Sequence, residues 1–89
     1  MKRDEHSLLE FPCRFPIKIV GHASPDFETE ILALIRRHAP ELSDEAVSRR
    51  PSQGGKYLAL TVTIEASSRQ QLDAIYRALS AHEQVVMSL

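Results

Sequence analysis

The side chains of this 89-residue chain that could perform catalysis or bind a metal are one cysteine and four histidines. These are Cys13, His6, His22, His38 and His82. No two histidines stand three or four residues apart and no CxxC pattern occurs, so the spacing predicts no metal centre. Cys13 has no base close to it in the sequence and cannot form an internal disulfide alone. We therefore expect no catalytic, cofactor-binding or metal-binding residues, and we interpret the protein as a non-enzyme.

The charge balance argues against partners that are bound mainly by electrostatic attraction. The sequence has 11 Lys and Arg against 12 Asp and Glu, a formal net charge of −1. Nucleic acids and acidic membranes attract domains with a clear basic excess, so neither is favoured here. The longest apolar run, residues 31–35, is far shorter than the roughly 20 residues of a transmembrane helix, and no signal peptide is visible. We expect a cytoplasmic protein.

Hydrophobic periodicity predicts the elements that must position any binding residues. In chain order they are a strand over 14–21, a helix over 24–38, a polar strand within 42–51, a strand over 56–66, a helix from 67 and a strand over 85–87. Ser24 is expected to cap the first helix. The second helix has two possible capping boxes at its start, Ser67 with Gln70 or Ser68 with Gln71.

The order β-α-β-β-α-β predicts an α+β ferredoxin-like sandwich, with a four-stranded antiparallel sheet and two helices on one face. Right-handed crossovers place the first and third strands, the two most apolar, in the centre of the sheet. Residues 14–89 are expected to form a single domain after a partly disordered N-terminal lead-in over 1–13. The pattern leaves open whether Leu8–Pro12 in that lead-in is structural or functional.

The sheet face opposite the helices is the first candidate interaction surface. It is expected to present Lys18, Val20, Tyr57, Ala59 and Thr61. A small, half-apolar face of this kind suits contact with a protein partner or self-association. RNA-recognition sheets stack bases on several aromatic side chains, and only Tyr57 is aromatic here, so RNA binding is the weaker alternative.

The turn after the first predicted strand is the second candidate. Gly21, His22 and Ser24 precede a helix whose first N–H groups could bind the carboxylate of a small amino-acid-like effector. Asp26 in the first helical turn would repel such a carboxylate, and Ser24 is already expected to cap the helix. A small-molecule effector site therefore stays an alternative to a protein-interaction surface.

Several short motifs together resemble the YbeD-like family of small bacterial proteins. They are the lead-in Leu8–Pro12 (LLEFP), His38–Pro40 after the first helix, and the hairpin pattern from Pro51 to Tyr57. The resemblance spans about residues 7–89 and implies a ferredoxin-like fold similar to the ACT regulatory domains of amino-acid metabolism. It implies a regulatory role linked to lipoate metabolism and supplies no catalytic or ligand residues. We therefore predict a regulatory or protein-interaction module.

Overall fold

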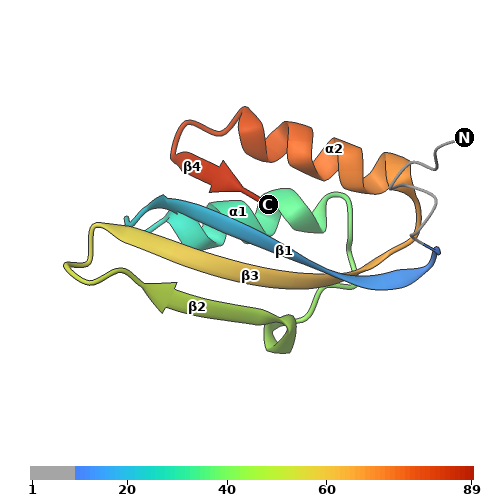
Figure 1. Ribbon diagram of the computed structural model, residues 1–89, viewed down its shortest axis with the longest axis horizontal. Coiled ribbons are helices and arrows are strands. Elements are labelled where there is room, and N and C mark those ends of the chain that lie inside the picture. Colours follow the sequence, from blue (N-terminus) through green and yellow to red (C-terminus); the bar gives the residue numbers. More distant parts are fainter. Residues whose placement is uncertain (1–9) are drawn as a thin grey trace, which may run out of the picture.

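The computed structural model describes residues 10–89, and their helices and strands follow the predicted order (Figure 1). The elements are β1 (Cys13–His22), α1 (Phe27–Arg36), the 3-10 helix η2 (Asp44–Ala46), β2 (Val47–Pro51), β3 (Tyr57–Ala66), α2 (Arg69–Ser80) and β4 (Val85–Ser88). Leu8, Leu9 and most of the predicted lead-in lie outside the described residues. Neither α-helix is long and apolar enough to cross a lipid bilayer.

The strands form one antiparallel sheet in the order β2-β3-β1-β4. β1 and β3 pair along their whole length, from Cys13 opposite Ala66 to His22 opposite Tyr57. The polar β2 and the short β4 are the two edges. The predicted ferredoxin-like α+β fold, with the first and third strands in the centre, is confirmed.

The hydrophobic core lies between the sheet and the helices that cover one of its faces. Alternate side chains of β1 and β3 point into it, and each helix contributes one apolar stripe. The largest fully buried side chains are Phe27, Ile17, Ile19, Ile31, Ile35, Leu60, Ile75, Leu79 and Val62. No polar or charged residue among residues 10–89 is buried.

The last residues of the predicted lead-in belong to the folded body. Cys13 is the first residue of β1 and pairs with Ala66, one residue earlier than the predicted domain start. Phe11 packs against the hydrophobic core. Within Leu8–Pro12, Phe11 thus has a structural role, because its ring extends the apolar surface beyond the strand.

The start of the first helix differs from the prediction. α1 begins at Phe27, and Asp26 occupies the N-cap position without a side-chain hydrogen bond to the helix. The Ser24 hydroxyl instead accepts a hydrogen bond from Nε2 of Gln84, at 3.1 Å. The expectation that Ser24 caps this helix was wrong, because a turn through residues 25–26 separates Ser24 from the first helical residue.

The start of the second helix follows one of the two predicted capping patterns. Ser68 Oγ accepts a hydrogen bond from the backbone N–H of Gln71 at 3.1 Å. Oε1 of Gln71 accepts in return from the backbone N–H of Ser67 at 2.7 Å. Nε2 of Gln71 also donates to the carbonyl of His38 at 2.7 Å. One side chain thus fixes the start of α2 and ties it to the segment after α1.

Candidate functional site

The histidines and the cysteine do not come together in the fold. His22 ends β1, His38 follows α1, and His82 follows α2, while His6 lies outside the described residues. Cys13 is half-buried at the start of β1. Residues 10–89 contain no group of three His, Cys, Asp or Glu side chains that could hold a metal ion. The surfaces described below are therefore considered by their shape, charge and apolar character.

The predicted interaction residues form two adjacent rows on the open face of the sheet. The register places Val20 of β1 opposite Ala59 of β3, and Lys18 opposite Thr61. Tyr57 lies on the same face, two residues before Ala59. All but Lys18 are half-buried. The fold therefore brings the five predicted residues into one continuous surface.

Tyr57 has a ring partner that the sequence did not indicate. Its register partner in the sheet is His22. The ring centroids of His22 and Tyr57 lie 5.3 Å apart with the planes tilted by 37°. His22 was predicted to belong to a ligand-binding turn, but the structure places it at the end of β1, on the open face.

A small apolar depression lies on the open face at the β2 side. Its volume is about 180 Å³, and it is lined by Val20, Arg50, Pro51, Ser52, Tyr57 and Ala59. Arg50 stands opposite Ala59 in the pairing of β2 with β3. An apolar hollow beside a guanidinium group suits a side chain or ligand that has an apolar body and an acidic end. Arg50 was not predicted to belong to this face, although its alternation with buried Val47 places it there.

The open face is basic although the chain is nearly neutral. Strand alternation gives it Arg14, Lys18 and Arg50, against one acid, Glu65. Within residues 10–89, Arg36, Arg49 and His82 form ion pairs, whereas Lys18 and Arg50 form none. Lys18 and Arg50 are therefore available to an acidic group of a partner.

The most exposed apolar side chains gather at the β4 edge of the sheet. Val86, Met87 and Leu89 are 54%, 46% and 66% exposed. Met87 stands opposite Val20, so this edge is continuous with the open face. The strand was predicted but the patch was not, although the run of uncharged residues from Val85 to Leu89 was the available signal.

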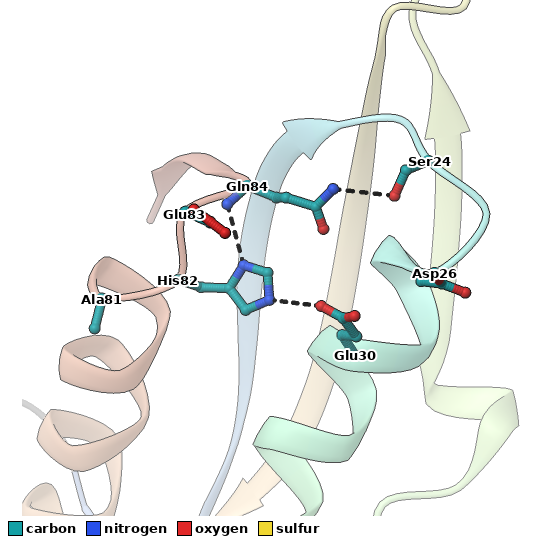
Figure 2. A pocket seen from close by; sticks show the side chains of 7 residues that line it. All are labelled: Ser24, Asp26, Glu30, Ala81, His82, Glu83 and Gln84. Atoms are coloured by element: carbon teal, nitrogen blue, oxygen red, sulfur yellow. Dashed lines mark hydrogen bonds and ion pairs between the residues drawn. The ribbon is translucent and has the colours of Figure 1, made fainter.

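An open depression of about 670 Å³ lies between the β1–α1 turn with the start of α1 and the α2–β4 turn. Figure 2 shows its lining residues, which are Ser24, Asp26, Glu30, Ala81, His82, Glu83 and Gln84. Nε2 of His82 lies 3.0 Å from Oε1 of Glu30, which connects the α2–β4 turn to α1. The carboxylates give this depression an acidic rim.

The three residues of the predicted ligand turn do not converge. Ser24 lines the acidic depression, whereas His22 lies on the open face. Gly21 is buried within β1, against the ring of Phe27. A ligand in the depression would therefore meet Ser24 and neighbouring side chains of α1 and the α2–β4 turn.

The resolved pKa shifts belong to packing contacts. The side-chain hydrogen bond from Arg49 lowers the pKa of the Glu28 carboxyl. The same contact raises the pKa of Arg49. Burial raises the pKa of the Tyr76 phenol. None of these groups lines the depressions described above, so these shifts do not indicate a reaction centre there.

Comparisons with known proteins show similarity over almost the whole chain. Residues 6–89 match the family profile described as "Protein of unknown function (DUF493)". A "UPF0250 protein" of Chromobacterium violaceum is 49% identical over 89 residues, covering 100% of both chains. "UPF0250 protein NE1487" of Nitrosomonas europaea is 46% identical over 85 residues, covering 96% of this chain and 98% of that protein.

A solved structure shares the fold at lower sequence identity. The solution structure of protein HP0495 from H. pylori superimposes with a TM-score of 0.69 and 18% sequence identity. The match covers 91% of this chain and 85% of the H. pylori chain. Similarity at this level of identity supports the fold and carries no information about activity.

Proposed function

The chain belongs to the DUF493 family of proteins of unknown function, and within that family we propose that it is a non-enzymatic, cytoplasmic protein-interaction module of regulatory type. The observation that carries the proposal is the open face of the sheet. There, Val20, Tyr57 and Ala59 line an apolar depression, and Arg50, which forms no ion pair within residues 10–89, stands at its rim. The surface combines an apolar anchor site with a charge that can select an acidic partner.

The chemistry of the face defines the partner. An apolar side chain of the partner would fill the depression beside Ala59, and an acidic neighbour would pair with Arg50 or Lys18. Arg suits this role because its planar guanidinium group binds a carboxylate in two-pronged geometry. The proposed partner is therefore a protein segment with an apolar residue next to Asp or Glu.

The regulatory part of the proposal rests on the family resemblance and on the absence of a catalytic grouping within residues 10–89. A regulatory domain can act by contacting another protein, and a site made of surface side chains fits that role. The implied link to lipoate metabolism directs the search for the partner toward enzymes of that pathway. This link is part of the proposal.

Affinity capture from native cells with matched variants tests the proposal. Arg50→Glu reverses the charge at the depression, and Arg37→Glu makes the same change on an exposed position just after α1. We expect a specific protein to be retained by the wild type and by Arg37→Glu, and lost with Arg50→Glu. Retention that is equal for both variants, or absent for the wild type, would contradict the proposal.

A second candidate is an effector site in the acidic depression at Ser24. Its carboxylates, among them Asp26 and Glu30, favour the ammonium group of an amino-acid-like molecule. An NMR titration with free amino acids tests this candidate, and lipoate, which has a carboxylate but no ammonium group, serves as the comparison ligand. Movement of the backbone amide signals of residues 21–28, reduced in Glu30→Gln, would support it. Unchanged signals at saturating ligand would exclude it.

A further inference from the structure

β4 is an edge strand, and its outer side has no strand partner within residues 10–89 (Figure 1). Its inner side bonds to β1: the N–H of Leu89 donates to the Lys18 carbonyl at 2.8 Å, and the N–H of Lys18 donates to the Leu89 carbonyl at 3.0 Å. In antiparallel pairs, hydrogen-bonded and non-hydrogen-bonded positions alternate. Ser88, opposite Ile19, therefore directs its N–H and C=O away from β1.

The side chains around this outward backbone group are apolar and exposed. Met87 and Leu89 flank Ser88. Because successive side chains of a strand point to opposite faces, both lie on the open face. Val86 is the extra residue where the register between β1 and β4 shifts, and it is 54% exposed. The segment from Val85 to Leu89 contains no charged side chain. An unpaired, uncharged edge of this kind is a template for pairing with another strand.

From this edge we infer that two copies of the chain associate by antiparallel pairing of β4 with β4. The proposed two-fold axis passes beside Ser88, so that Ser88 bonds to Ser88 of the second copy. In this register Met87 of each copy lies opposite Leu89 of the other. Met87 and Leu89 then cover one another on the open face, and no like-charged side chains meet.

The other edge of the sheet explains why the association stops at two copies. β2 carries Arg49, Arg50 and Pro51. Two such strands side by side would place like charges together, and proline lacks the N–H that a ladder requires. One permissive edge per copy gives a closed dimer, whereas two would allow an open filament.

The dimer would contain one continuous sheet of eight strands, since each copy contributes four. Both open faces would then lie on the same side of that sheet. The depression beside Arg50 in one copy would lie at a fixed distance and orientation from that in the other copy. This arrangement favours a partner with two matching segments. The dimer itself does not depend on the proposed function, because its contacts lie at β4 and not in the depression.

The first test is the mass of the protein in solution, measured by sedimentation velocity from micromolar to millimolar concentration. So short a ladder covers less than the roughly 1,200 Å² of a standard interface, so the dimer should form in the upper part of this range. Met87→Lys should weaken it at least tenfold, and Ser48→Lys on the β2 edge should not. A wild type that stays monomeric throughout, or a dimer indifferent to Met87→Lys, would overturn the inference.

The second test fixes the register by cross-linking. In a Cys13→Ser background, Ser88→Cys places two thiols across the axis at a Cα separation of about 5.5 Å, within the range of a disulfide. Oxidised glutathione takes up the two hydrogen atoms that the thiols lose. We expect covalent dimer from Ser88→Cys and little from the matched edge variant Ser48→Cys. Equal cross-linking of the two variants would overturn the register. Arg50→Glu should leave the dimer intact, which separates this inference from the proposed function.

Discussion

Gly21, near the end of β1, packs against the ring of Phe27, the first residue of α1. A Cβ atom on Gly21 would lie 2.3 Å from Cζ of Phe27 and 2.6 Å from the backbone oxygen of Gln84. Both distances are far inside van der Waals contact. The positive-φ glycines of the described chain are Gly54 and Gly55, so space rather than backbone conformation requires glycine at position 21. This glycine joins β1, α1 and the segment before β4.

Gly21→Ala should destabilise the fold by about 1–3 kcal/mol, the usual cost of forcing extra volume into a packed site. Urea unfolding followed by circular dichroism measures the free energy of unfolding. The double variant with Phe27→Leu provides the control, because a shorter side chain removes the closest contact. The cost of Gly21→Ala should be smaller in that background. Equal costs in both backgrounds would show that the ring is not the obstacle.

Gln71 should be more important for stability than its exposed neighbour Gln70. Its side chain accepts from the N–H of Ser67 and donates to the carbonyl of His38. Loss of half-buried hydrogen bonds of this kind costs about 1–3 kcal/mol. Gln71→Ala should therefore lower the free energy of unfolding by that amount, and Gln70→Ala should change it little. Thermal unfolding monitored by calorimetry compares the two, and similar effects would argue against the bridging role.

The contact between Glu28 of α1 and Arg49 of β2 predicts a pH-dependent contribution to stability. Nε of Arg49 donates to both carboxylate oxygens of Glu28, at 2.9 Å and 3.0 Å. This hydrogen bonding lowers the pKa of Glu28 from its usual 4.5 in the folded protein. A carboxyl with a lowered pKa stabilises the fold above its unfolded-state pKa, and the contribution disappears as pH falls through the folded-state pKa.

Glu28→Gln should therefore lower the melting temperature near neutral pH by a few degrees at most, since the pair is partly exposed to solvent. The difference from wild type should shrink as pH falls below 4.5 and at high salt. Melting curves at several pH values measure it, with Glu41→Gln at an exposed position as the control. A difference that grows on acidification would refute the assigned sign.

Single-stranded RNA is the other macromolecule that an open four-stranded sheet can bind. Among the described positions, the open face offers the rings of His22 and Tyr57 at one end only. We expect no retardation of an oligouridine in a mobility-shift assay at physiological salt, because stacking at one end of the face alone is too little to hold successive bases. A salt-dependent shift in the wild type that Tyr57→Ala abolishes would favour RNA over a protein partner.

The element order could be predicted because its signals are local. Each signal lies within a short stretch of sequence: the apolar alternation in β1 and β3, and the capping pattern at Ser68. The structure confirmed the elements that these signals predict. The polar β2 could be placed at an edge because charge and proline disfavour a central position. The family resemblance agreed with this architecture. The candidate face over Lys18, Val20 and β3 followed from the same alternation once the helices were assigned to one side.

The sequence by itself thus determined the elements, the centre of the sheet and the residues of its open face. Only the tertiary structure decided which distant side chains meet there. Arg50 reaches the depression because of the β2–β3 register, and Ser24 bonds Gln84 from sixty positions away instead of capping α1. The physical reason is that periodicity specifies which way a side chain points, whereas register and helix docking specify what it meets.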